Sequence, residues 1–304
     1  MISAPRSTRS RALRRATDLG LVVVTAFAAV LSAAPCQAEA PPPRIVSANI
    51  ASDEILIALA PERLVAVSVL VGNPEVSNVT EVAAKLPVRV GADVEAIVAL
   101  RPDVVAIGGQ ASPIAAQLES LGIRVVRVQG FESIAWVENL IRALGEAAGV
   151  PARADRMIAA MRTRLAAVRE RVAVRPRPRV LTYSAAGTTA GRDTLLDEMI
   201  HTAGGVNVAA EIGVSGFKRV SLERVLAADP DLILLRTMRR WAPGFAVELA
   251  QHPALRSMRA VTTGRVHEIP GRLIVAASQH IATAVEALAD VLHPDTVPGR
   301  APSR

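Results

Sequence analysis

The sequence is poor in cysteine and in aromatic residues. Its 304 residues include one cysteine, two tryptophans, one tyrosine and four phenylalanines. A single cysteine excludes a disulfide within the chain, so the folded protein must be stabilised by buried apolar side chains. The 51% hydrophobic composition is sufficient for two cores. A pocket lined wholly by aromatic side chains is excluded by the same scarcity of rings.

Motifs for metal binding and nucleophilic catalysis are also missing. No metal-ligand spacing occurs among the five histidines, which all lie in the second half of the chain: His201, His252, His267, His280 and His293. A transition-metal site needs three or four converging ligands, so a receptor for a bare zinc or manganese ion is disfavoured. Ser184 lacks the Gly-x-Ser-x-Gly context of a hydrolase. The glycines of Gly187–Gly191 lack the lysine of a phosphate-binding loop and indicate a flexible strand-to-helix connection.

Residues 1–38 have the pattern of a secretory signal peptide. A segment with five arginines precedes the uncharged apolar run Leu19–Ala34, which is short for a membrane span. Cleavage after Ala38 would remove the only cysteine, Cys36, and Pro35 immediately before that cysteine argues against a lipid anchor. We therefore expect an exported, periplasmic protein without a lipid anchor.

Removal of this leader changes the charge balance. The leader carries five arginines and one aspartate, so the formal charge falls from +7 to +3 in the mature chain. The high isoelectric point is therefore no argument for a nucleic acid partner. No second segment of membrane length follows, and we expect the mature protein to be a soluble monomer.

Beyond a linker at 39–43, strand and helix patterns alternate along the chain. Short runs of valine and isoleucine, bounded by glycine and proline, indicate buried parallel strands with helices between them. One long amphipathic helix over Pro151–Val174 interrupts this alternation. The sequence predicts an α/β fold in which two Rossmann-like lobes, with mostly parallel sheets, are joined by one long interdomain helix. We assign the lobes to residues 44–150 and 176–294, the bridging helix to 151–175, and a tail to 295–304.

Two segments, 128 residues apart, have nearly the same sequence. Glu95–Val105 and Glu223–Ile233, the two echo segments, share their glutamate, an alanine and a Pro-Asp pair. Each predicts a short helix that opens with a carboxylate, stops at proline and leads into a buried strand. A glutamate in the first helical turn interacts favourably with the helix dipole, and this interaction alone is enough to explain either residue. Its matched place in both lobes also permits a second interpretation, two exposed anionic contacts for a partner.

Arginine and aromatic side chains gather where predicted strands end. Ligands of parallel α/β sheets bind outside the carboxyl ends of the strands. Guanidinium groups bind carboxylates and phenolates in forks, which suits a bulky and partly apolar anion, although surface arginine is often merely solvated. We expect the ligand-binding side chains among Arg89, Gln110, Tyr183, Phe217, Arg236, Arg239, Trp241 and Arg272.

Several short motifs together resemble the periplasmic binding proteins for cobalamin, haem and ferric siderophores. Besides the echo segments, they are Arg44-Ile-Val-Ser47, Leu121-Gly-Ile-Arg-Val-Val126, Ala203-Gly-Gly-Val-Asn207 and His252-Pro-Ala254 with Gly264-Arg-Val-His267. The resemblance covers residues 44–294. It implies a type III binding-protein fold, with the ligand in a cleft between the lobes and no catalysis. It also implies that Glu95 and Glu223 pair with arginines of an ABC permease.

The resemblance leaves the ligand open. Cobalamin binders of this family tend to carry an aromatic residue just before the first echo helix, where this chain has Arg89-Val-Gly. Siderophore binders often have an arginine there, which favours a ferric siderophore or related iron chelate. Haem would require a tyrosine or histidine as axial ligand, and Tyr183 is the only tyrosine. Cobalamin and haem therefore remain alternative ligands. Two alternative functions also remain: an exported hydrolase that uses Ser184 and His280, and a sensor subunit that presents its ligand to a membrane receptor.

Overall fold

The computed structural model describes residues 41–86, 88–109, 113–130, 132–237, 251–253, 255–275 and 277–296. The predicted α/β fold with parallel sheets is confirmed. The first sheet has the strand order β3-β2-β1-β4-β5, and all its pairings are parallel. Its strands are β1 Ile45–Ala48, β2 Leu64–Ser68, β3 Arg89–Val90, β4 Val104–Gly108 and β5 Arg124–Val128. Its helices are α1 Ile50–Leu59, α2 Thr80–Ala83, α3 Val94–Ala99, α4 Pro113–Ser120 and α5 Ile134–Ala147.

The second sheet has the strand order β11-β10-β6-β8 and is also parallel. Its strands are β6 Arg179–Tyr183, β8 Val206–Asn207, β10 Leu232–Thr237 and β11 Val266–Pro270. The helices of this part are α7 Leu195–Thr202, α8 Val208–Glu211, α9 Leu222–Ala228, α11 Arg259–Thr262, α12 Arg272–Val275 and α13 Ile281–Leu292. Consecutive residues of β10, Leu232–Leu235, are all buried, so both faces of the sheet are covered there, as is usual for a parallel sheet.

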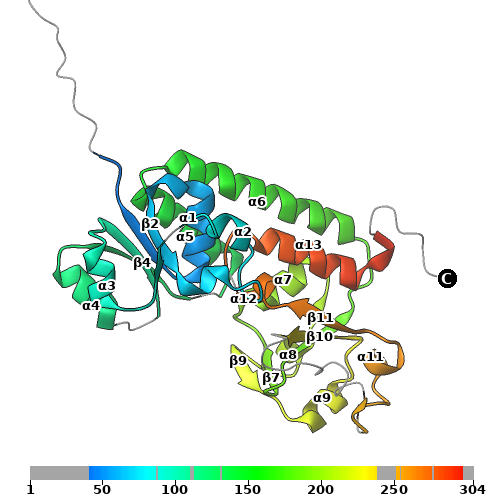
Figure 1. Cartoon of the computed structure of the whole chain (residues 1–304). Coiled ribbons are helices and arrows are strands. Elements are labelled where there is room, and N and C mark those ends of the chain that lie inside the picture. The colour runs from blue at the N-terminus through cyan, green and yellow to red at the C-terminus, as the bar shows by residue number, and fades with distance from the viewer. Residues whose placement is uncertain are drawn as a thin grey trace, which may run out of the picture. The chain divides into compact units, whose positions relative to one another are not determined.

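The long helix α6 Pro151–Val172 ends two residues before its predicted end. Its buried residues recur at helical spacing: Ala154, Ile158, Met161, Leu165, Val168 and Val172. The helix packs on α5 and α13, as Figure 1 shows. Gly145 of α5 permits the close approach, because a Cβ atom there would lie 2.4 Å from the Ala154 Cβ atom. One apolar cluster thus joins side chains of both sheets through α6. The exact boundaries of the two lobes stay a prediction.

Two local predictions were wrong. The predicted flexible connection at Gly187–Gly191 contains a strand, β7 Thr188–Ala190, which pairs antiparallel with β9 Phe217–Arg219. The β-branched pair Thr188-Thr189 favours the extended form, but its partner strand follows much later in the chain and left no local signal. A helix is also predicted over Val247–Met258, of which residues 247–250 and 254 lie outside the described residues. Residue 251 is helical, but 255–258 form turns and a bend instead of helix.

Candidate functional site

The first echo segment is held by an arginine at the start of β1. The backbone N–H of Arg44 donates to Asp103 Oδ2 at 2.7 Å, and its guanidinium donates to the carbonyls of Leu100 and Arg101 at 2.8 and 3.1 Å. Arg101, just before Pro102, has a left-handed backbone with φ of 49°. We call Arg44, Leu100, Arg101 and Asp103 the N-terminal clamp. It satisfies carbonyls at the end of α3 that the helix itself leaves unpaired.

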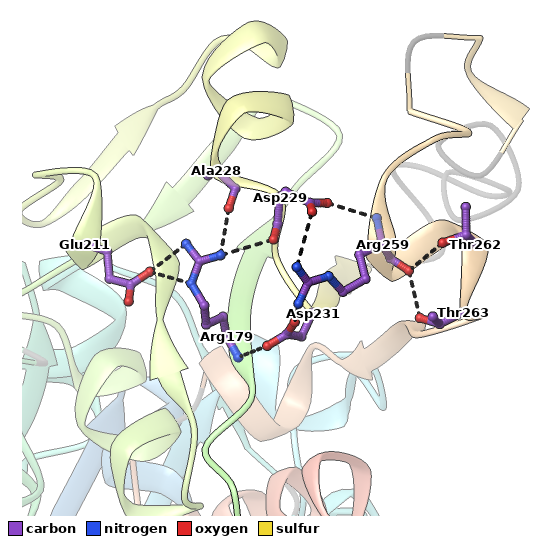
Figure 2. Close-up of polar contacts among 8 residues, drawn as sticks. All are labelled: Arg179, Glu211, Ala228, Asp229, Asp231, Arg259, Thr262 and Thr263. Atoms are coloured by element: carbon purple, nitrogen blue, oxygen red, sulfur yellow. Dashed lines mark hydrogen bonds and ion pairs between the residues drawn. The ribbon is translucent and has the colours of Figure 1, made fainter.

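The second echo segment repeats these contacts residue by residue. The backbone N–H of Arg179 donates to Asp231 Oδ2 at 2.9 Å, and its guanidinium donates to the carbonyls of Ala228 and Asp229 at 2.9 and 3.1 Å. Asp229 occupies the position of Arg101 and has a φ of 39°. Figure 2 shows this C-terminal clamp, formed by Arg179, Ala228, Asp229 and Asp231. The hydrogen bonds are repeated as well as the amino-acid sequence, so the two echo segments occupy equivalent places in the two sheets.

The C-terminal clamp carries additional ion pairs. The Arg179 guanidinium also contacts Glu211 Oε2 at 2.9 and 3.0 Å. Arg259 donates from its backbone to Asp229 at 2.9 Å and from its guanidinium to Asp231 at 2.6 Å (Figure 2). Three carboxylates and two guanidinium groups therefore surround the end of α9. Such a network holds its members more firmly than isolated surface pairs do.

The two glutamates of the echo segments lie at matching, exposed helix positions. Glu95 is the second residue of α3, after the N-cap Asp93, and Glu223 is the second residue of α9, after the N-cap Ser221. Hydrogen bonds from the Ser221 side chain and from its own backbone N–H lower the pKa of Glu223. Both side chains are exposed, each at the start of a helix whose far end is clamped.

The predicted ligand arginines have different environments. Arg89 directs its guanidinium inward, where it donates to the carbonyls of Ala83 and Leu86 at 2.6 and 2.5 Å and so caps the end of α2. Arg272 begins α12 and is exposed, and its guanidinium has no hydrogen bond or ion pair with the described part of the chain. Among the described residues, Arg272 is therefore the better placed of the two for an external anion. Gln110, Arg239, Trp241 and the side chain of Arg236 lie outside the described residues.

Tyr183 and Phe217 also differ in exposure. Tyr183, at the end of β6, is only 9% exposed, and its hydroxyl lies 3.5 Å from the Val220 carbonyl. Burial raises the pKa of this phenol. Phe217, on β9, is 55% exposed. Sequence reasoning did not single out Val69 and Leu70, which follow β2 and are 60% and 49% exposed, although apolar side chains after a parallel strand are suitable contacts for a ligand.

Metal and nucleophile sites find little support in the described residues. No group of three or more histidine, cysteine or acidic side chains there could hold a metal ion. The Ser184 hydroxyl lies 2.6 Å from Thr188 Oγ1 and also accepts the Thr188 N–H, so it closes the turn between β6 and β7. No contact joins Ser184 to His280 among the described residues.

Sequence reasoning missed a pair of buried carboxylates in α1. Asp53 and Glu54 are both 0% exposed. Asp53 accepts the N–H and the hydroxyl of Ser68 at 3.1 and 2.5 Å. Burial raises the pKa of Asp53 to about 6, and hydrogen bonds from Ser47 and Ser68 oppose part of that rise. Burial likewise raises the pKa of Glu54. In the sequence the pair looks like ordinary acidic residues of a first helical turn.

We expect Asp53→Asn to remove a pH dependence of stability. The pKa of Asp53 in the fold, about 6, is higher than its ordinary value of 3.8, so between these pH values the folded protein holds a proton that the unfolded chain has released. The free energy of unfolding therefore falls as the pH rises through this interval, by up to roughly 3 kcal/mol. Asn keeps an acceptor for the Ser68 N–H and cannot ionise, so the variant should be the more stable protein at pH 7.5.

Urea unfolding at pH 4.5 and 7.5 measures this difference. The control is Asp155→Asn, which changes an exposed carboxylate on α6. If the free energy of unfolding falls by the same amount between the two pH values in the parent and in Asp53→Asn, Asp53 is not the titrating group.

Two parallel α/β sheets joined through one long helix define the class of two-lobed binding proteins with a helical connection. The family model described as periplasmic binding protein matches residues 45–273. The chain belongs to this family, as the motifs of the sequence predicted. No helix in the described part of the chain is long and apolar enough to cross a membrane.

Individual relatives are more distant. A cobalamin-binding protein of Halobacterium salinarum is 30% identical over 210 residues, which cover 67% of this chain but only 57% of the relative. An uncharacterised ABC transporter substrate-binding lipoprotein of Bacillus subtilis is 26% identical over 274 residues, with 84% of this chain and 81% of the relative covered. The apo structure of the periplasmic haem-binding protein RhuT from Roseiflexus sp. RS-1 superposes with a TM-score of 0.72 at 27% identity, over 84% of this chain and 100% of RhuT.

Proposed function

We propose that this protein captures a metal chelate whose metal already has a full set of ligands, with cobalamin as the first candidate, and delivers it to an ABC permease. Membership of the periplasmic binding protein family supports a binding role without catalysis. The relative from Halobacterium salinarum is a cobalamin-binding protein, and the one from Bacillus subtilis is an ABC transporter substrate-binding lipoprotein.

The environment of Tyr183 carries the choice of ligand. Haem iron is held in proteins by axial ligands such as histidine, tyrosine, cysteine or methionine. Tyr183 is the only tyrosine, is 9% exposed and directs its hydroxyl to a backbone carbonyl. All five histidines follow residue 200, so the first sheet supplies none. Cobalamin and ferric siderophores need no axial ligand from the protein, because the cobalt or iron is coordinated within the chelate.

A ferric siderophore is the second candidate, and Arg272 is the observation that favours it. Its exposed guanidinium suits a carboxylate or phenolate of an anionic chelate. Arg89, which favoured a siderophore in the sequence, already donates to carbonyls of its own lobe. The exposed apolar residues Val69, Leu70 and Phe217 would suit the uncharged faces of a corrin.

Delivery would use Glu95 and Glu223 as the contacts with the permease. Both are exposed at matching helix starts, and clamps of the same design hold their helices. We further propose that residues 1–38 are removed on export and that the mature protein acts in the periplasm, since its family is that of periplasmic binding proteins.

Tryptophan fluorescence during titration with cyanocobalamin, haemin, a ferric hydroxamate and a ferric catecholate tests the proposal. We expect submicromolar affinity for cyanocobalamin, a value ordinary for a specific pocket. Tight binding of haemin with an axial-ligand absorption spectrum, and none of cyanocobalamin or siderophores, would overturn it. Turnover of an ester substrate that disappears in Ser184→Ala would instead establish the hydrolase alternative.

A further inference from the structure

A buried glutamate connects segments that belong to different sheets. Glu54, in the helix that follows β1, accepts the N–H of Asn78 at 2.7 Å, the Asn78 side-chain amide at 3.1 Å and the Ser278 hydroxyl at 2.5 Å. Ser278 lies 224 residues later, between β11 and α13 of the second sheet. Gln279 adds a hydrogen bond from its side chain to the Glu54 carbonyl at 3.0 Å.

The same cluster reaches the backbone of Arg272. The Asn78 side-chain amide donates to the Arg272 carbonyl at 2.9 Å as well as to Glu54. Glu54 thus holds Asn78, and Asn78 holds the first residue of α12. Apart from the apolar contacts through α6, this cluster is a direct polar connection between the two sheets in the described residues.

In every hydrogen bond of its side chain in this cluster, the Glu54 carboxylate is the acceptor. The Asn78 N–H, the Asn78 side-chain amide and the Ser278 hydroxyl all donate, and an ionised glutamate is a group that only accepts. Both Asn78 donors point at Glu54 Oε1, and the Ser278 hydroxyl points at Oε2. A glutamine could keep an oxygen toward Asn78, but its amide nitrogen would have to donate to the Ser278 oxygen, and the hydrogen bonds from Asn78 would become neutral and weaker. Burial of this carboxylate is compensated by its hydrogen bonds to Asn78 and Ser278, and those bonds also tie segments of the two sheets together.

We infer that Glu54 and Asn78 are positioning residues, which hold the Arg272 end of α12 and thereby the angle between the two sheets in the geometry that receives the ligand. The inference rests on the proposed function only in taking Arg272 as a ligand contact. The order imposed on Arg272 before binding would lower the entropy cost of capture, and it would slow dissociation of the ligand.

Variants of Glu54 test the inference with and without ligand. Spin labels are placed on the mature protein at two exposed positions, Ala99 of α3 and Ala227 of α9. Pulsed electron paramagnetic resonance measures the distribution of distances between the two labels, and we expect Glu54→Gln to broaden this distribution. This readout needs no ligand. With cyanocobalamin, or the siderophore that the titration identifies, the dissociation rate should rise about tenfold, the effect of losing one charged hydrogen bond. The control Glu81→Gln changes an exposed glutamate of α2.

A second substitution separates positioning from stability. Glu54→Gln with Asn78→Asp restores a charge-assisted hydrogen bond between the two side chains, but the carboxylate that replaces the Asn78 amide is unable to donate to the Arg272 carbonyl. We expect the double variant to regain thermal stability and still to release ligand fast. If Glu54→Gln fails to fold, the same measurements are made on Ser278→Ala, which removes one hydrogen-bond donor to Glu54. An unchanged distance distribution in a folded variant would overturn the inference, whereas broadening without binding of any chelate would overturn only the proposed function.

Discussion

Reversing the charge of both Glu95 and Glu223 is expected to abolish delivery of the ligand while its affinity stays unchanged. Both side chains are exposed and lie at the starts of α3 and α9, so arginine at either place causes no clash in the core. The cost to folding is limited to a less favourable interaction with the helix dipole, which solvent screens at exposed positions. A charge pair that is lost at a protein interface weakens association by roughly two orders of magnitude, and a repulsive pair weakens it further.

Uptake of radiolabelled ligand by cells that carry the permease measures this effect, and fluorescence titration of the purified variant measures affinity. We expect uptake to fall by at least about a hundredfold in Glu95→Arg with Glu223→Arg, because both contacts are lost together. Reversal of two other exposed glutamates, Glu146 and Glu170, is the matched control and should leave uptake intact. The docking role would be refuted if the variant with both Glu95→Arg and Glu223→Arg took up ligand at the parental rate, or if uptake fell equally in the control.

Much of the fold followed from local sequence patterns. Buried strands such as β4 and β10 are short aliphatic runs, and α6 has apolar residues at helical spacing along its whole length, so period alone identified them. The echo segments also predicted the matched positions of Glu95 and Glu223. These features are encoded within windows of about a dozen residues, and tertiary contacts did not override them.

The candidate site was harder to predict because its contacts are distant in sequence. In the sequence, Asp53 and Glu54 look like residues of a solvated first turn. Their hydrogen-bond partners Ser68, Asn78 and Ser278 lie far away in the sequence and are brought to them only by the fold. The inward direction of the Arg89 guanidinium depends on where α2 ends. Strand β7 depends on a partner that follows at Phe217. No local pattern records these pairings.

The clamps give the last prediction, in which two equivalent substitutions have unequal effects. Arg179→Met should lower the free energy of unfolding by about 2–4 kcal/mol, since it removes charged hydrogen bonds to two helix-end carbonyls and to Glu211. Arg44→Met should cost about 1 kcal/mol or less, because Arg44 is exposed and water replaces its contacts to the Leu100 and Arg101 carbonyls.

Amide hydrogen exchange distinguishes a local clamp from a general loss of stability. Under native conditions, Arg179→Met should accelerate exchange in α9 and leave α3 close to its parental rates, and Arg44→Met should do the reverse, because each arginine holds the end of only one of these helices. Equal acceleration in both helices, or equal costs of the two substitutions in urea unfolding, would contradict the clamp interpretation. The expected asymmetry has a physical cause in the repeat itself. The same hydrogen bonds occur twice, but Arg179 lies half-buried among carboxylates and Arg44 lies in solvent.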